Sequence, residues 1–162
     1  MRFAGGVFKV GKLWAIEIPI LDIATQGRTK KEAYEMIADA VESLVNKKGF
    51  EARVFGKKGS AFEIGASDQG ALSALLLRRL RQKAGLSLQE VAARLGSKST
   101  NSYARYEQGR SVPSVDTFAK LFSAVAPNRE FVIMESRVRY GRSSPRHDGR
   151  RKSLPSKPPA CP

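Results

Sequence analysis

Two hydrophobic patterns divide this chain of 162 residues. Up to residue 66, apolar residues form short runs with alternating polar positions, which is typical of strands, apart from one segment with a helical period. From residue 71 onward, apolar residues recur at spacings of three and four, which is typical of buried helix faces. A polar segment, residues 67–70, separates the two parts as a linker. The pattern therefore predicts an α+β chain, with a small mixed unit over residues 1–66 and an all-α unit over residues 71–136.

The first unit has the expected element order β-β-β-α-β. Its β-prone runs are residues 1–10, 13–18, 23–26, 50–55 and 61–64, of which the last two form one or two strands. Gly11-Lys12 favours a hairpin between the first two runs. Gly56-Lys57-Lys58-Gly59 is the expected turn before the last run. This order predicts a sheet with one helix packed across it.

The helix of the first unit is expected to begin after Thr29, because Glu32 lies three residues later and completes a capping box. Its expected end is Gly49. The buried stripe of this helix is expected to consist of Ala33, Ile37, Val41, Leu44 and Val45. In the second β-prone run, Trp14 and its alternate neighbours share one face, so Glu17 points the other way, toward solvent or a partner.

Four helices are expected in the second unit. The first ends at Gly85 and buries a stripe made of Leu72, Leu75, Leu76 and Leu80. The second begins after Ser87, where Glu90 completes another capping box, and Gly96 forms the turn that follows. The third is expected to be capped by Ser99 or Thr100 and to end at Gly109.

Ser114 is expected to cap the fourth helix of this unit. The residues expected to complete the core from this helix are Val115, Phe118, Ala119, Leu121, Phe122 and Val125. After Pro127, the run Phe131-Val-Ile-Met-Glu is β-prone and is a candidate for pairing with a second copy of the chain or with the sheet of another subunit.

The second unit has the features of a DNA-binding domain, because a helix held by two others fits the major groove with its first turns against the bases. Asn pairs with adenine and Arg with guanine, while Ser and Thr pair with either. A helix N-terminus and a side-chain amide can hold phosphate, which is the role expected of Gln89. The expected DNA contacts are Gln89, Lys98, Ser99, Thr100, Asn101, Ser102, Arg105 and Arg110.

The second unit also resembles a known family, the Xre/Cro-like helix-turn-helix proteins. The resemblance is carried in order by Leu86-Ser-Leu-Gln-Glu-Val-Ala, Leu95-Gly, Tyr103-Ala-Arg-Tyr-Glu-Gln-Gly and Pro113-Ser. Ser97-Lys98 lengthens the turn before the third helix, which leaves open which of residues 99–102 reads the bases. The expected partner is operator double-stranded DNA. A dimer or tetramer is expected because two half-sites multiply specificity.

Net charge agrees with a polyanionic partner. The chain carries +14 in total. Residues 1–70 carry 11 Lys or Arg against 9 acids, residues 71–136 carry 10 against 5, and residues 137–162 carry 8 against 1. Positive charge therefore concentrates in the helical unit and in the Pro/Arg-rich tail over residues 137–162, which is expected to be disordered.

Composition also bears on location and on cofactors. The single cysteine, Cys161, lies in the tail, so no disulfide framework or zinc site is expected. No run approaches the ~18 apolar residues of a membrane helix, and the N-terminus has no apolar leader pattern. We expect a cytoplasmic protein with no membrane partner and no cofactor.

The first unit carries a second resemblance. Trp14-Ala-Ile-Glu-Ile-Pro, followed by Thr25-Gln-Gly-Arg-Thr-Lys-Lys-Glu-Ala, is similar to the HicB antitoxin family. That resemblance implies a partial RNase H-like fold, followed by a DNA-binding domain. It also implies that residues 1–66 bind and block a small mRNA-cleaving toxin of the HicA kind. The helix-turn-helix would then repress the operon of a type II toxin–antitoxin pair.

A basic toxin favours an acidic contact surface. The candidate toxin-binding residues are Trp14, Glu17, Glu35, Asp39 and Glu42. The alternative is a ligand-responsive repressor whose first unit senses a small molecule, and it predicts an apolar pocket with a few convergent polar groups.

Catalysis is not expected. An RNase H-type nuclease needs clustered acids that hold two metal ions. Glu32 has a local role as a cap partner, and the acids that follow it along the helix are expected to form a solvated face. The only histidine, His147, lies in the tail, so the folded part has no histidine as a general base.

Overall fold

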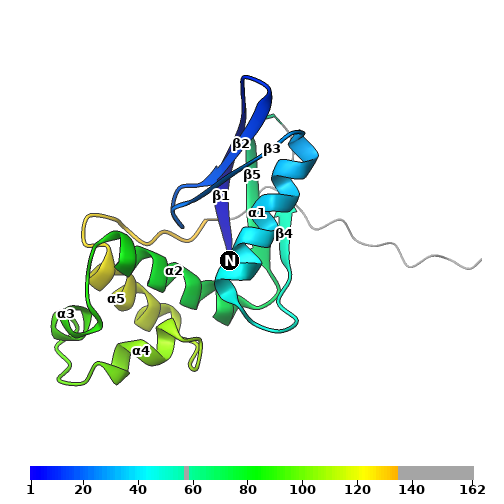
Figure 1. Cartoon of the computed structure of the whole chain (residues 1–162). Helices are drawn as coiled ribbons and strands as arrows, with labels where there is room; N and C mark the ends of the chain where they lie inside the picture. Colours follow the sequence, from blue (N-terminus) through cyan, green and yellow to red (C-terminus); the bar gives the residue numbers. More distant parts are fainter. Residues whose placement is uncertain (57–58, 135–162) are drawn as a thin grey trace, which may run out of the picture.

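The computed structural model of the chain describes residues 1–56 and 59–134. Its elements in chain order are β1 (Arg2–Val10), β2 (Leu13–Ile18), β3 (Ile23–Gly27), α1 (Lys30–Val45), β4 (Ala52–Phe55), β5 (Ala61–Ala66), α2 (Gln69–Lys83), α3 (Leu88–Arg94), α4 (Asn101–Glu107) and α5 (Val115–Val125). The molecule is α+β, with a curled sheet next to a group of helices (Figure 1). Lys57, Lys58 and the tail, with His147 and Cys161, lie outside the described residues.

The five strands form one antiparallel sheet in the order β3-β2-β1-β5-β4. Val10 pairs with Leu13, so the predicted two-residue hairpin turn at Gly11-Lys12 is confirmed. Gly11 has a φ of 58°, which suits glycine. The element order predicted for the first unit is confirmed, with both late runs forming strands. An RNase H-like assignment stays a prediction.

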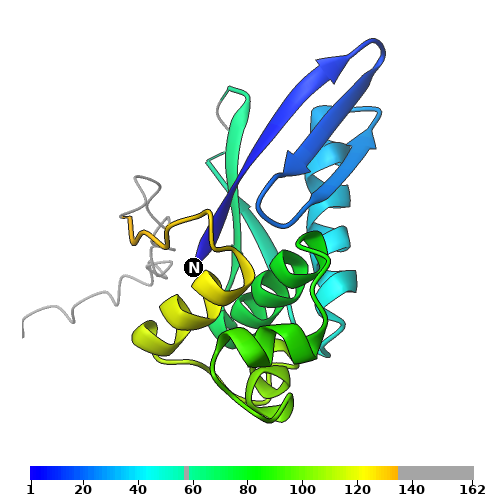
Figure 2. The same ribbon diagram turned by 90° about the vertical axis from the view of Figure 1, so that its left-hand side faces the viewer.

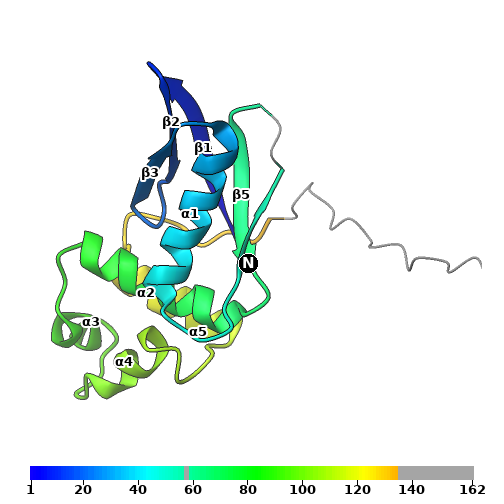
Figure 3. The ribbon, with the colours of Figure 1, turned by 45° about the vertical axis from the view of Figure 1, so that its right-hand side comes forward.

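Helix α1 covers one face of the sheet (Figure 3). Directly paired residues of an antiparallel sheet share a face, so the pairing places Val7, Ile16 and Ile64 on the face under α1, where they are buried. The helix buries Ala33, Tyr34, Ile37 and Val41 against them. Among the described residues no helix lies on the other face (Figure 2).

The boundaries of α1 differ in detail from those predicted. Thr29 caps the helix as expected and accepts the N–H of Glu32, but the Glu32 carboxylate accepts the N–H of Arg28 at 2.7 Å instead of the cap residue's own N–H. The helix ends at Val45, before the predicted Gly49, because Asn46 adopts the left-handed conformation and donates its N–H to the carbonyl of Glu42. Asparagine adopts the left-handed conformation less readily than glycine, so Asn46 was a weaker sequence signal for the end of the helix than Gly49.

The core of α1 also differs from the prediction. Tyr34, which the predicted stripe omits, is 5% exposed and packs edge-on against Phe62 at 5.6 Å. Leu44 and Val45, which the stripe includes, are only half-buried. The last turn of the helix extends toward the helical unit, where fewer sheet residues remain to cover it.

The second unit is built around α2, which buries Leu72, Leu75, Leu76 and Leu80 as predicted. Helices α3, α4 and α5 pack around it (Figure 1). In α5, Ser114 caps the helix and Phe118, Leu121, Phe122 and Val125 are buried, but Val115 is 61% exposed. The prediction that Val115 belongs to the core was wrong, because the buried stripe of α5 begins one turn later, at Phe118.

The polar segment between the units is short. Helix α2 starts at Gln69, with Asp68 as its cap, so Gln69 and Gly70 lie in a helix and not in a connecting loop. The buried residues of both units form one continuous cluster. Whether residues 1–66 and 71–136 are separate domains stays a prediction.

Candidate nucleic-acid interface

Helices α3 and α4 and the turn between them form the candidate reading element. The Ser87 hydroxyl accepts the N–H of Glu90 and the Glu90 carboxylate accepts the N–H of Ser87, so the predicted capping box is confirmed. The hydrogen bond from the Ser87 N–H to the carboxylate lowers the pKa of Glu90. Gly96 has a φ of 69°, and the Ser97 N–H returns to the carbonyl of Ala92 at 2.9 Å. The turn is therefore fixed by its own backbone.

Serine side chains in the lengthened turn form a small hydroxyl network. Ser97 donates to the carbonyl of Ser99 at 3.1 Å, and Ser102 donates to the same carbonyl at 2.7 Å. Thr100 occupies the cap position without a side-chain cap hydrogen bond, while the Ser99 hydroxyl accepts the N–H of Asn101 at 3.3 Å. Thr100 therefore holds the cap position left open by the sequence, while Ser99 supplies the hydroxyl that accepts a first-turn N–H.

This network narrows the choice of base-reading residues. Ser102 is half-buried and its hydroxyl is engaged within the chain. Thr100 and Asn101 are exposed. We therefore expect Thr100 and Asn101 to reach the bases in preference to Ser102. The other predicted contacts that are exposed are Gln89, Lys98, Ser99, Arg105 and Arg110.

Arg105 is held in place on the exposed side of α4. Its Nε donates to the Ser111 hydroxyl at 2.9 Å, and its guanidinium carbon lies 5.7 Å from the centre of the Tyr106 ring. A hollow of about 560 Å³ beside it is lined by Asn101, Ser102, Ala104, Arg105, Gln108, Arg110 and Ser111. Sequence analysis did not identify Ser111, because its contact with Arg105 depends on how the loop after α4 folds back.

A buried ion pair fixes α4 to α2. The Nε of Arg81 lies 3.0 and 3.1 Å from the two carboxylate oxygens of Glu107, and an Nη lies 2.9 Å from one of them. The other Nη donates to the carbonyl of Leu86 at 2.7 Å. Glu107 is 7% exposed. Sequence reasoning missed this pair, although Glu107 falls on the buried side of α4 with Tyr103 and Ala104.

Tyr103 adds a second tie between α4 and α2. Its ring is fully buried, and its hydroxyl donates to the carbonyl of Leu77 at 3.2 Å. Burial raises the pKa of Tyr103. The recognition helix α4 thus rests on α2 through one aromatic anchor and one ion pair.

Helix α2 is also tied to the first unit. Arg78 donates to the carbonyl of Leu44, and Arg79 donates to the carbonyls of Leu21 and Asp22, both at 2.6 Å. Lys83 lies 3.4 Å from the Asp22 carboxylate. These cations are engaged inside the molecule, so they are not counted among the DNA contacts.

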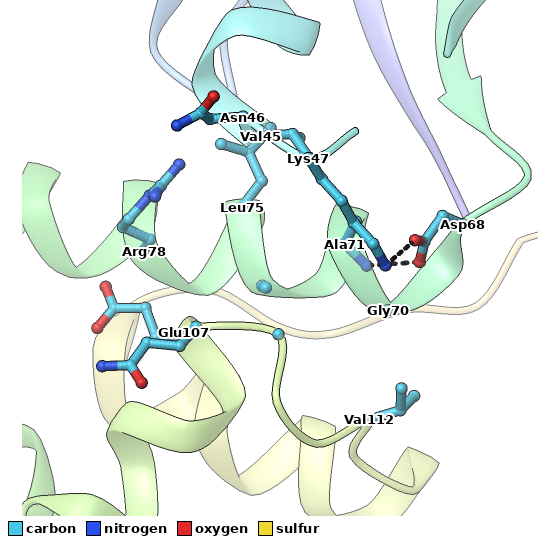
Figure 4. A pocket seen from close by; sticks show the side chains of 13 residues that line it. Val45, Asn46, Lys47, Asp68, Gly70, Ala71, Leu75, Arg78, Glu107 and Val112 are labelled. Carbon is cyan, nitrogen blue, oxygen red and sulfur yellow. Dashed lines mark hydrogen bonds and ion pairs between the residues drawn. The ribbon is translucent and has the colours of Figure 1, made fainter. Parts of the chain in front are cut away.

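A cavity of about 320 Å³ lies where the two units meet (Figure 4). It lies between the end of α1, the first half of α2 and the end of α4. Lys47 crosses it to Asp68 at 2.6 Å, and this bond, with the N–H of Ala71, lowers the pKa of Asp68. The lining is more polar than the pocket expected for a ligand-responsive repressor.

The predicted toxin contacts do not share one surface. Glu35 and Asp39 are exposed on α1, and Glu35 lies 3.6 Å from Lys31. Glu42 accepts the N–H of Ala52 at 2.8 Å, so it braces the start of β4. The remaining two candidates lie in β2: Trp14 faces α1, with the Lys30 ammonium 5.5 Å from its ring centre, and Glu17 points to the opposite face of the sheet.

Residues 1–56 and 59–134 hold no group of three or more His, Cys, Asp or Glu side chains placed to bind a metal ion. No helix in this part of the chain is long and apolar enough to cross a membrane.

Comparison with known proteins agrees with this geometry. A family model described as a helix-turn-helix domain matches residues 74–126, which is the stretch that contains α3, α4 and α5. These residues form a helix-turn-helix domain. The domain indicates DNA binding and transcription regulation. None of the curated proteins compared with the chain matches it.

Proposed function

We propose that the protein is the antitoxin of a type II toxin–antitoxin pair. In this proposal, residues 1–66 bind a HicA-like mRNA-cleaving toxin directly, and the helix-turn-helix represses the operon that encodes both. The proposal rests on one observation: the chain joins a helix-turn-helix to a small sheet, and one face of that sheet is not covered by any helix of residues 1–56 and 59–134. The resemblance of residues 14–33 to the HicB family gives the partner.

Operator binding is supported by charge and exposure. The exposed side chains around α4 include two cations, Arg105 and Arg110, with Lys98 in the turn before it. Cations at this place can neutralise phosphates on either side of the groove that α4 enters. The amide of Asn101 is available for a base edge.

Dimerisation is supported by the segment that follows α5. Phe131 packs against Phe118 at 5.0 Å, but Val132, Ile133 and Met134 are 64%, 74% and 82% exposed. Three consecutive exposed apolar side chains are typical of an interaction surface. Residues 131–134 belong to no strand among the described residues of this chain. The predicted pairing with a second copy stays a prediction.

Ile133→Asp is expected to weaken self-association at least tenfold, because a carboxylate would replace an apolar contact between copies. Operator affinity should fall with it, since two linked domains read more base pairs than one. Sedimentation equilibrium and operator titration measure the two effects. Val115→Asp, at another exposed apolar position, on α5, is the control and should change neither. Equal behaviour of the two variants would contradict the proposal.

Toxin neutralisation is tested with the full chain. Co-expression with the toxin encoded beside it should restore growth, and Arg105→Ala should restore growth equally well while losing operator repression. This separation is expected because Arg105 lies on α4, whereas the proposed toxin surface belongs to residues 1–66. Growth rate and a reporter placed behind the operator are the readouts.

One outcome of that experiment favours the second candidate function. If the chain binds operator but no product of a neighbouring gene, the ligand-responsive repressor becomes the better explanation. The cavity at the junction of the two units is then the sensing site, because a molecule bound there would contact both α1 and the end of α4.

A further inference from the structure

The acidic side chains of α1 are mostly engaged. Glu32 accepts a backbone N–H before the helix, Glu42 accepts the N–H of Ala52, and Glu35 pairs with Lys31. Asp39 is left as the one carboxylate of this helix with no partner among the described residues. An acidic patch on α1 is therefore a poor basis for holding a cationic protein.

The face of the sheet that points away from α1 is largely uncharged in β1, β2 and β3. Arg2 and Ala4, at the start of β1, point away from α1 beside β5, and Arg2 pairs with Glu63 there at 3.0 Å. From Gly6 onward in β1, and along β2 and β3, the residues that point away from α1 are Gly6, Phe8, Val10, Leu13, Ala15, Glu17, Ala24 and Gln26. Phe8 and Val10 are 44% and 57% exposed. Glu17 is the only charged side chain in this set, and no described residue pairs with it. We call these eight residues the open sheet face.

The strand that borders the open sheet face is an unprotected edge. Strand β3 ends the sheet and consists of Ile-Ala-Thr-Gln-Gly, without a charge or a proline. The other edge, β4, carries Arg53, which pairs with Glu51 at 3.3 Å. Exposed edges are usually protected by charges or proline, because their free N–H and C=O groups can pair with another strand. The two edges of this sheet differ in that respect.

We propose that the toxin of the pair binds at the open sheet face, adding an extended segment to β3 and placing an arginine or lysine against Glu17. The proposal rests on the antitoxin function and names the surface and the chemistry of the partner. We choose the toxin as the binding partner because of charge complementarity. A protein that cleaves RNA must present cations to phosphate, and on the open sheet face Glu17 is an unpaired carboxylate among uncharged residues.

Two structural details support this mode of binding. The side chains next to Glu17 are small, since Gly6 and Ala24 are its direct partners on the neighbouring strands. A long cationic side chain on a strand added at the β3 edge can therefore cross Ala24 to reach Glu17. A second copy of the chain fits less well, because β3 of that copy carries no cation to place against Glu17.

The test measures binding of the purified full chain to an inactive form of the neighbouring toxin. Glu17→Arg and Ala24→Arg both place a cation on the open sheet face, and each is expected to raise the dissociation constant about 100-fold. Asp39→Arg adds a cation on α1 and is the control, with an expected change below about threefold. Operator affinity should stay the same for all three variants, which checks that they are folded.

The outcomes separate this inference from the function on which it rests. If the unchanged chain does not bind the toxin, the antitoxin proposal falls, and this inference falls with it. If the unchanged chain binds and only Asp39→Arg weakens the complex, the toxin sits on α1 and the inference alone is overturned. Loss of self-association in Glu17→Arg, with toxin binding intact, would identify a second copy as the occupant and also overturn it.

Discussion

Replacing Glu107 by alanine is expected to lower the free energy of unfolding by about 3–5 kcal/mol, the usual range for breaking a buried ion pair. The reason is that Arg81 would keep its charge at the contact between α2 and α4 with only the Leu86 carbonyl as a partner. Chemical denaturation of the full chain measures the loss. Operator affinity should fall as well, because Glu107 holds the end of the recognition helix.

Two further variants make this expectation specific. Gln108→Ala, at the exposed next position, should change stability by less than about 0.5 kcal/mol. The double variant Arg81→Met with Glu107→Leu should regain most of the lost stability, since a buried ion pair can often be replaced by apolar residues of similar volume. A Glu107→Ala variant as stable as Gln108→Ala would show that the ion pair contributes little.

Local signals in the sequence predicted the helices of the second unit well. Ser87 with Glu90, and Ser114 before α5, are caps whose hydrogen bonds run between residues three apart, so the necessary information lies in one short segment. The hairpin at Gly11-Lys12 is local in the same sense. The predicted end of α1 failed for a related reason: two residues, Asn46 and Gly49, can each adopt the left-handed conformation, and the sequence does not say which one ends the helix.

The candidate sites depended on information that is not local. Arg81 and Glu107 are 26 positions apart, and nothing in either segment marks the other as its partner. Alternation along β2 correctly placed Glu17 opposite Trp14, but only the packing of α1 on the Trp14 face shows that Glu17 lies apart from the acidic residues of that helix. Likewise, the sequence around Glu42 predicts a solvated carboxylate on a helix face, whereas in the structure this carboxylate accepts the N–H of Ala52 at the start of β4.

Arg105→Ala is expected to weaken binding to the operator by about 1–3 kcal/mol while leaving binding to a scrambled duplex nearly unchanged, because a bidentate arginine–guanine contact carries sequence information. The Ser111 hydroxyl holds the Nε of Arg105 and leaves the two Nη groups for a base edge. Ser111→Ala should therefore reduce the same preference by a smaller amount, since it removes the support and keeps the guanidinium.

Lys98→Ala is the matched control for that experiment, as it removes one cation from the turn just before the same helix. A phosphate contact has no preference for sequence, so this variant should weaken both duplexes alike and lower the slope of log affinity against log salt by about one. Titrations of both duplexes at several salt concentrations separate the two patterns. If Arg105→Ala loses equally on operator and scrambled DNA, Arg105 contacts phosphate. The base-reading role then falls to Thr100 and Asn101 at the start of α4, where neither side chain has a partner in the hydroxyl network of the turn.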